Sequence, residues 1–220
     1  LGEFTALCAA NVISLKDTAI LLKIRGQSMQ EAVPNGEGSM AALISSDFSK
    51  LDNLINMVKK IGVCEIANHN SSEQIVVSGY AKAVEELVNI SDKFSIKRAV
   101  LLNVSAPFHC SLMMPAQIKL ENELKEITFN DPDLPIICNY TAVAENNPLK
   151  LKENIINQVT NKVRWKETME YALDKKINKV SIMQLSKDGQ KVIGSKISIA
   201  CDCLGVSGGW TPAVHLFTQS

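Results

Sequence analysis

The sequence lacks several features that would assign it to a class at once. Its 23 lysine and arginine residues are balanced by 23 aspartate and glutamate residues, so no basic field points to nucleic acid and no polybasic run points to a membrane surface. The longest apolar runs are a handful of residues, too short to span a bilayer. The helical, acidic start is unlike a signal peptide. We therefore expect a cytoplasmic protein with neither membrane nor nucleic acid among its partners.

The cysteines form neither a metal pattern nor a disulfide framework. Six of them are scattered over the 220 residues, and only Cys201 and Cys203 are close together. No histidine stands at a zinc-ligand spacing from that pair. Without a secretion signal, reduced thiols are the expectation.

The middle of the chain alternates between strand and helix periodicity. With 46% hydrophobic residues the chain can fill a core. Strands are expected at 39–44, 63–67, 74–78 and 99–104, and helices at 46–61 and 81–94. This β-α-β-β-α-β order is that of a ferredoxin-like unit, for which we expect the boundaries 38–105. Outside it we expect helices at 2–10, 14–33, 112–127, 149–160 and 164–173, and short strands at 136–139 and 179–183.

Arg25 is a candidate for anion binding. Ser14 and Asp17 have the spacing of a helix-capping pair. On the helix that follows, apolar residues recur at helical spacing, namely Leu15, Ala19, Leu22, Gly26, Met29 and Val33. Arg25 lies on the flank of this face, and its planar guanidinium suits a carboxylate. The alternative is an arginine whose stem covers apolar surface and whose head pairs with a nearby acidic residue.

His109 is a candidate general base. It follows an apolar strand and the turn at Pro107, and its ordinary pKa near ~6.5 lets it accept a proton at neutral pH. A hydrogen-bonded loop histidine is the alternative. Asn70 belongs to a polar turn over residues 68–72, which either orients a ligand or satisfies its own backbone.

Several blocks of the sequence resemble, in one order, those of a known family. They are Leu1-Gly2-Glu3, Arg25-Gly26 with residues 29–34, residues 36–42, residues 68–79, Ser105-Ala106-Pro107-Phe108-His109, and Gln158-Val159-Thr160 with Val163-Arg164-Trp165. The family is that of the malonyl-CoA:acyl carrier protein transacylases, and the resemblance covers about residues 1–180. In this family a serine within Gly-His-Ser-Leu-Gly-Glu attacks malonyl-CoA, and the phosphopantetheine thiol of acyl carrier protein then takes the malonyl group.

The resemblance implies a role for each matching residue. His109 is the general base, and Arg25 binds the malonyl carboxylate. Leu1 follows the nucleophile, so its backbone N–H belongs to the oxyanion hole. Met29 and Asn70 contact the substrate, and Phe108 favours malonyl over methylmalonyl. The implied partners are malonyl-CoA and acyl carrier protein, with no bound cofactor and no metal.

The resemblance also implies that this sequence corresponds to only part of the family's fold. Residues 1–37 and 106–183 correspond to a partial large subdomain of α/β-hydrolase-like type whose N-terminal strands, with the nucleophile serine, are missing from this sequence. Residues 181–185 read Ser-Ile-Met-Gln-Leu where the family has a Glu-Ile-Gly-Pro-Gly turn that helps to hold the histidine. We expect residues 184–220 to be irregular, and the 220-residue chain alone to be inactive.

Three hypotheses about function stay open at this point. The chain is part of a malonyltransferase, or a non-catalytic remnant of one produced by gene decay, or a polyketide-type acyltransferase domain. A Gly-His-Ser sequence directly before Leu1 would separate the first hypothesis from the second. Arg25 and Phe108 speak against a large acyl group that has no carboxylate.

Overall fold

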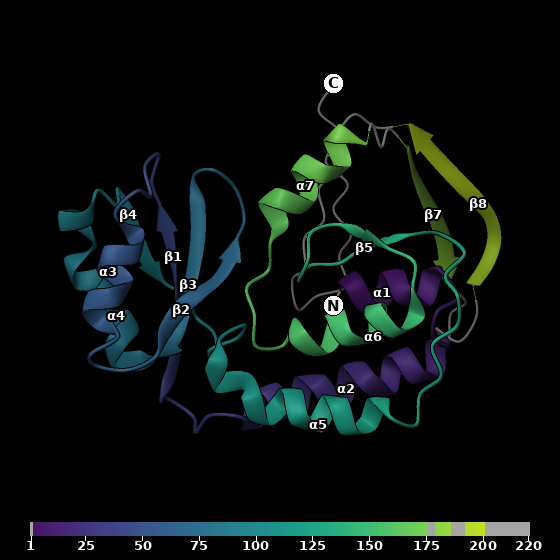
Figure 1. The fold of residues 1–220 in the computed structure, drawn as a ribbon, viewed down its shortest axis with the longest axis horizontal. Coiled ribbons are helices and arrows are strands. Elements are labelled where there is room, and N and C mark those ends of the chain that lie inside the picture. The colour runs from purple at the N-terminus through teal and green to yellow at the C-terminus, as the bar shows by residue number, and fades with distance from the viewer. Residues whose placement is uncertain (1, 176–178, 186–191, 201–220) are drawn as a thin grey trace.

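The computed structural model describes residues 2–175, 179–185 and 192–200. Helices and strands alternate along these residues, and the α/β class predicted from the sequence is confirmed. The buried apolar side chains gather mainly into two large clusters, one around a four-stranded sheet and one among the helices that surround it in sequence. Figure 1 shows the sheet with its own helices on the left and most of the other helices to the right.

Four antiparallel strands form the sheet, in the spatial order β2-β3-β1-β4. The strands are β1 (Gly38–Ile44), β2 (Cys64–His69), β3 (Gln74–Tyr80) and β4 (Arg98–Leu101). Within β1, Ala41 stands opposite Val77 of β3 and Leu101 of β4. The helices α3 (Leu51–Val58) and α4 (Ala81–Ile90) cover one face of the sheet (Figure 1). The element order is therefore β-α-β-β-α-β, as predicted.

The first core lies between this sheet and its two helices. Leu43 and Val77 of the sheet and Leu54 and Leu87 of the helices are fully buried in it. Burying one such side chain stabilises the fold by roughly 1.5–3 kcal/mol. The amphipathic periodicity of α3 and α4 places such side chains on the face toward the sheet, and their burial holds these helices there.

The second core lies among helices that precede and follow the sheet in the sequence. The helices are α1 (Gly2–Ala9), α2 (Leu15–Glu31), α5 (Met114–Leu124) and α6 (Pro148–Asn157). Fully buried Leu7, Leu21, Leu120 and Leu151 come one from each helix. Figure 1 shows α2 and α5 side by side.

Shorter elements complete the described part of the chain. Helix α7 (Trp165–Asp174) follows α6, and 3-10 turns occupy Ser91–Phe94 and Ser111–Met113. The two-residue strands β5 (Ile136–Ile137) and β6 (Ala144–Glu145) pair antiparallel, as do β7 (Lys179–Leu185) and β8 (Val192–Ala200).

The predicted cap of α2 is confirmed. The Ser14 hydroxyl oxygen accepts from the backbone N–H of Asp17 at 3.0 Å, and the same hydroxyl donates to the Asp17 carboxylate at 2.6 Å. Such a cap stabilises a helix by about 0.5–2 kcal/mol.

Two predicted boundaries were wrong for a local reason. The helix expected at 46–61 begins only at Leu51, because Ser45 and Asp47 bond nearby backbone N–H groups with their side chains and hold a turn there. The strand expected to reach residue 104 ends at Leu101. The N–H of Val104 donates to the carbonyl of Leu102, and this tight turn takes the chain out of the sheet.

The irregular conformation predicted for residues 184–220 was wrong for 184–185, which belong to β7, and for 192–200. There β8 pairs with β7, with Ile199 opposite Val180. The alternation of Ile197, Ser198 and Ile199 is the period-2 pattern of a strand. Residues 186–191 and 201–220 of that prediction lie outside the described residues.

Candidate active site

His109 follows β4 and Pro107 in the chain, as predicted, and lies in the loop between β4 and the Ser111–Met113 turn. Its φ angle of 61° is left-handed, which is uncommon for a residue with a side chain. Its neighbours hold it in place. The ring of Pro107 packs so tightly on Gly38 that a Cβ built there would lie 2.3 Å from the proline Cδ. Cys110 is fully buried, and its thiol donates to the Pro107 carbonyl at 3.1 Å.

Gln158, at the C-terminal end of α6, contacts the imidazole of His109 twice. The Nδ1 atom of His109 lies 3.1 Å from the Gln158 backbone carbonyl oxygen and 2.9 Å from its amide nitrogen Nε2. The amide oxygen Oε1 accepts from Nη2 of Arg25 at 3.2 Å. Because a guanidinium offers only donors, Arg25 turns the oxygen of the amide toward itself and its nitrogen toward His109.

Two effects keep His109 neutral. Burial first, and then the positive charge of Arg25, lower the pKa of His109 to about 3, although the hydrogen bond that His109 donates to the Gln158 backbone carbonyl acts in the opposite direction. Nδ1 cannot form a hydrogen bond at both contacts, because the amide nitrogen of Gln158 only donates. With its proton on Nδ1, donated to the Gln158 carbonyl, the imidazole presents its own Nε2 as a free acceptor, and the amide nitrogen of Gln158 is a neighbour without a hydrogen bond. That is the state a general base needs at neutral pH.

Arg25 lies on the buried face of α2 rather than on its flank. The residues of α2 that are buried are Thr18, Leu21, Ser28 and Met29. Thr18 and Ser28 are tolerated there because their hydroxyls donate to the carbonyls of Ser14 and Ile24. Ala19, which was predicted to lie on the buried face of this helix, is exposed. The face predicted from apolar residues alone was therefore rotated about the helix axis relative to the face that is buried.

The guanidinium of Arg25 is desolvated and only partly bonded. Burial lowers the pKa of Arg25, and the charge of Glu3 raises it. Its Cζ lies 6.0 Å from the centre of the Phe4 ring. The Nε atom is buried without a hydrogen-bond partner. An unpaired buried donor on a cation is a favourable place for an anionic ligand.

The other predicted site residues are placed differently. Met29 is buried in the helical core, and partly buried Phe108 packs against that core as well as against Met40, Ala67 and Val76. The side-chain amide of Asn70 donates to Gln74 at 3.0 Å across the turn between β2 and β3. Roles for these three in substrate contact stay predictions, and Leu1 lies outside the described residues.

Two residues of this region, Gln158 and Glu3, were not predicted as site residues from the sequence. The contact that orients His109 comes from a backbone carbonyl, which leaves no mark in the amino-acid pattern. Gln158 could have been found only through the late block that resembles the family. Glu3, the last residue of the first block, carries a buried carboxylate beside the same cation.

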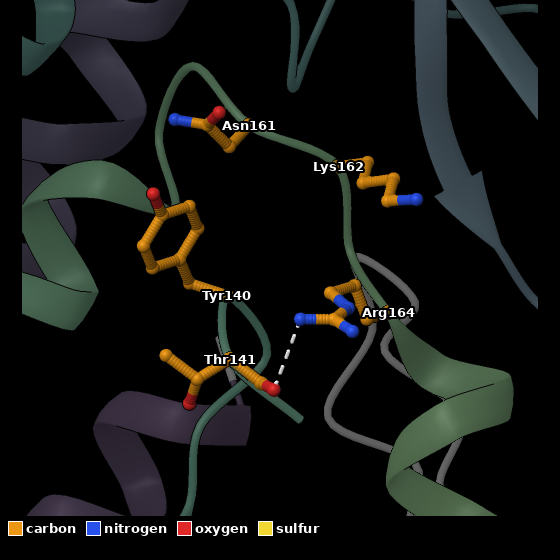
Figure 2. A pocket seen from close by; sticks show the side chains of 5 residues that line it. All are labelled: Tyr140, Thr141, Asn161, Lys162 and Arg164. Carbon is orange, nitrogen blue, oxygen red and sulfur yellow. Dashed lines mark hydrogen bonds between the residues drawn. The ribbon is translucent and has the colours of Figure 1, made fainter. Parts of the chain in front are cut away.

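A pocket of about 510 Å³ lies next to the end of α6. Its lining side chains are Tyr140, Thr141, Asn161, Lys162 and Arg164. In Figure 2 the Arg164 guanidinium donates to the carbonyl of Thr141 at 3.1 Å, while the Lys162 ammonium points away toward a strand. None of the predicted site residues lines this pocket.

In the part of the chain that the structure describes, every helix is too short or too polar to cross a membrane. Among those same residues, His, Cys, Asp and Glu side chains form no group of three or more that could hold a metal ion.

The chain belongs to the acyl transferase domain family, whose model matches residues 1–183. It is similar to the malonyl CoA-acyl carrier protein transacylase of Escherichia coli strain K12, with 39% identity over 171 residues, 78% of this chain and 55% of that protein. The enzyme of that name from Bacillus subtilis strain 168 is 40% identical over 170 residues, 77% of this chain and 54% of that protein.

Solved structures that are similar to this chain are malonyltransferases as well. The acyl-carrier-protein S-malonyltransferase from Bartonella henselae is 47% identical, with a TM-score of 0.77, covering 80% of this chain and 56% of that one. A malonyl-transacylase solved in complex with its type II PKS acyl-carrier protein is 36% identical, with a TM-score of 0.76, covering 79% and 56%. The family predicted from the sequence is confirmed. The chain spans a little over half the length of these relatives.

Proposed function

We propose that this chain forms part of an enzyme that transfers a malonyl group from malonyl-CoA to the phosphopantetheine thiol of acyl carrier protein. The observation that carries the proposal is the chain of contacts Arg25–Gln158–His109, which joins a neutral base to a desolvated, partly unpaired cation. An acyl donor that carries one free carboxylate besides its thioester needs both groups in one place. The transferases named above supply the analogy.

In this proposal the nucleophile is the serine that the family motif places directly before Leu1. Nε2 of His109 takes the serine proton as the hydroxyl attacks the thioester carbonyl, and the Leu1 N–H donates to the oxyanion that forms. The imidazolium then protonates the departing CoA thiolate. In the second half the phosphopantetheine thiol gives its proton to His109 and attacks the malonyl-serine carbonyl. The ester bond to serine then breaks, and the imidazolium returns the proton to the departing serine oxygen. The Gln158 carbonyl holds the imidazole in the required tautomer throughout.

Arg25 provides selectivity in the proposal. Its unpaired Nε and its remaining N–H groups bind the malonyl carboxylate, which acetyl-CoA lacks. Phe108, directly before the base, restricts the space beside the malonyl methylene, and Met29 lies on the same helix as Arg25.

The two large hydrophobic cores support the proposed division of the chain. Residues 38–105 hold the sheet with α3 and α4, while 1–37 and 106–183 hold the helical core and the candidate site. We propose that the second group is the catalytic subdomain and the first is the inserted small subdomain.

The test uses the chain completed with a family N-terminal segment that ends in Gly-His-Ser. Malonyl and acetyl transfer to acyl carrier protein are measured for the parent, His109→Ala and Arg25→Ala, with Lys23→Ala as a control that removes an exposed cation from the same helix. His109→Ala should abolish both transfers. Arg25→Ala should lower kcat/KM for malonyl by the equivalent of about 2–5 kcal/mol and leave acetyl transfer nearly unchanged.

Equal loss of malonyl and acetyl transfer in Arg25→Ala would show that Arg25 does not select between the two donors. A completed chain that transfers neither group would favour the non-catalytic remnant. Transfer of methylmalonyl as fast as malonyl would favour the polyketide-type reading, which predicts a wider acyl pocket beside Phe108.

A further inference from the structure

Glu3 is a buried carboxylate to which the proposed mechanism gives no role. It lies in the first turn of α1 with 7% of its surface exposed. Its Oε2 accepts from the backbone N–H of Asn139 at 3.2 Å and from the Asn139 side-chain amide at 2.8 Å. Its Oε1 is buried without a hydrogen-bond partner.

Glu3 and Arg25 are opposite charges in one desolvated region that do not bond each other. Phe4, the residue after Glu3, has its ring under the Arg25 guanidinium, and the negative charge of Glu3 acts on Arg25. Glu3 is held by Asn139, and Arg25 is held by Gln158. Arg25 keeps Nε unpaired, and Glu3 keeps Oε1 unpaired. Burial raises the pKa of Glu3, while hydrogen bonds from Asn139 and from the Cys138 thiol lower it and so favour the charged carboxylate. That negative charge in turn raises the pKa of Arg25.

We propose that Glu3 is a positioning residue that sets the strength of the carboxylate site at Arg25, because it is a fixed counter-charge with which a substrate carboxylate must compete. The inference rests on the proposed role of Arg25. In the free protein Glu3 offsets the cost of a buried cation. When a malonyl carboxylate binds, two carboxylates share one guanidinium, and their repulsion weakens the binding.

A moderated carboxylate site suits a transferase. The malonyl group must bind with malonyl-CoA at the start of the first half-reaction and leave on acyl carrier protein at the end of the second, so an anchor that is too strong slows release. A counter-charge beside the anchor lowers its affinity without removing its selectivity, since a neutral acyl group gains nothing from Arg25 in either case.

The experiment measures binding of malonamate, the monoamide of malonic acid, to the 220-residue chain by calorimetry. Malonamate carries one carboxylate and an uncharged carbonyl in place of the thioester, and acetamide is the neutral control ligand. Glu3→Gln keeps an oxygen that accepts from Asn139 but removes the charge, and Glu3→Asp keeps the charge. Glu121→Gln removes an exposed carboxylate from α5 as the matched control.

We expect Glu3→Gln to bind malonamate roughly tenfold more tightly than the parent, which is the effect of about one pKa unit of interaction. Glu3→Asp and Glu121→Gln should keep the parent affinity, and acetamide should not distinguish the variants. A merely structural Glu3 would give weaker binding in Glu3→Gln. If that variant fails to fold by circular dichroism, Glu3→Ser provides a second neutral side chain with the same expectation.

The outcomes separate the two proposals. Binding that is lost in Arg25→Ala but unchanged or weaker in the neutral Glu3 variants overturns the role of Glu3 and keeps that of Arg25. No binding by the parent or by any Glu3 variant overturns both.

Discussion

The Nδ1 atom of His109 lies 3.1 Å from the backbone carbonyl oxygen of Gln158, and the side chain of the same glutamine reaches Arg25. The residue that selects the tautomer of the candidate base therefore also fixes the candidate carboxylate anchor. The two functions are separable by mutation, because a side-chain substitution removes the amide but leaves the carbonyl in place.

Replacing Gln158 by leucine should affect Arg25 more than His109. The buried guanidinium loses its hydrogen-bond acceptor, and we expect unfolding in urea to show a loss of about 1–3 kcal/mol. In a completed enzyme the preference for malonyl over acetyl should fall while acetyl transfer persists. Asn161→Ala removes an exposed amide nearby as a control. Complete loss of acetyl transfer in Gln158→Leu would mean that the amide, and not the carbonyl, orients the base.

The lowered pKa of His109 predicts a pH dependence of stability. In the folded protein the pKa is about 3 against 6.5 for the free side chain, so between these values the unfolded chain binds more protons. The free energy of unfolding should therefore fall as pH decreases from about 6.5. His109→Gln should remove part of this slope, as measured by urea unfolding at about pH 5 and about pH 7. Equal slopes in parent and variant would contradict the burial of a neutral imidazole.

Gly38→Ala should disturb the loop that carries His109. An added Cβ would meet the Pro107 ring at 2.3 and 2.5 Å, so the ring must move. We expect a loss of stability of about 1–3 kcal/mol, measured by thermal unfolding, and a lower rate in the completed enzyme. Gly26→Ala in α2 is the control: nothing lies within 4 Å of its added Cβ, and it should stabilise the helix by up to about 1 kcal/mol. An unchanged Gly38→Ala variant would show that the loop is not packed as described.

Local rules predicted much of the fold. The Ser14–Asp17 cap and the alternation of strands and helices around the sheet follow from spacing and periodicity, and both were confirmed. The buried face of α2 was misplaced, because periodicity counts Thr18 and Ser28 as polar, whereas their hydroxyls are satisfied within the helix. Whether a polar side chain is satisfied depends on geometry that a hydrophobic pattern does not contain.

The candidate site was predicted in part. The sequence marked Arg25 and His109 as individuals, and family resemblance gave them their roles. Their connection depends on Gln158, whose position is set by how α6 packs on α5. That is a tertiary contact between residues 133 apart in sequence. The left-handed backbone of His109 likewise depends on the packing of Pro107 on Gly38.

The most direct test is the intact mass of the protein after incubation with malonyl-CoA. The chain completed with a family segment ending in Gly-His-Ser should gain one malonyl group, and His109→Ala should block this. Residues 1–220 alone should gain none. Cys110, the thiol next to the base, is buried, donates to the Pro107 carbonyl, and has its pKa raised by burial. A stoichiometric adduct on residues 1–220 alone, or an adduct that persists in the completed His109→Ala variant, would contradict the account.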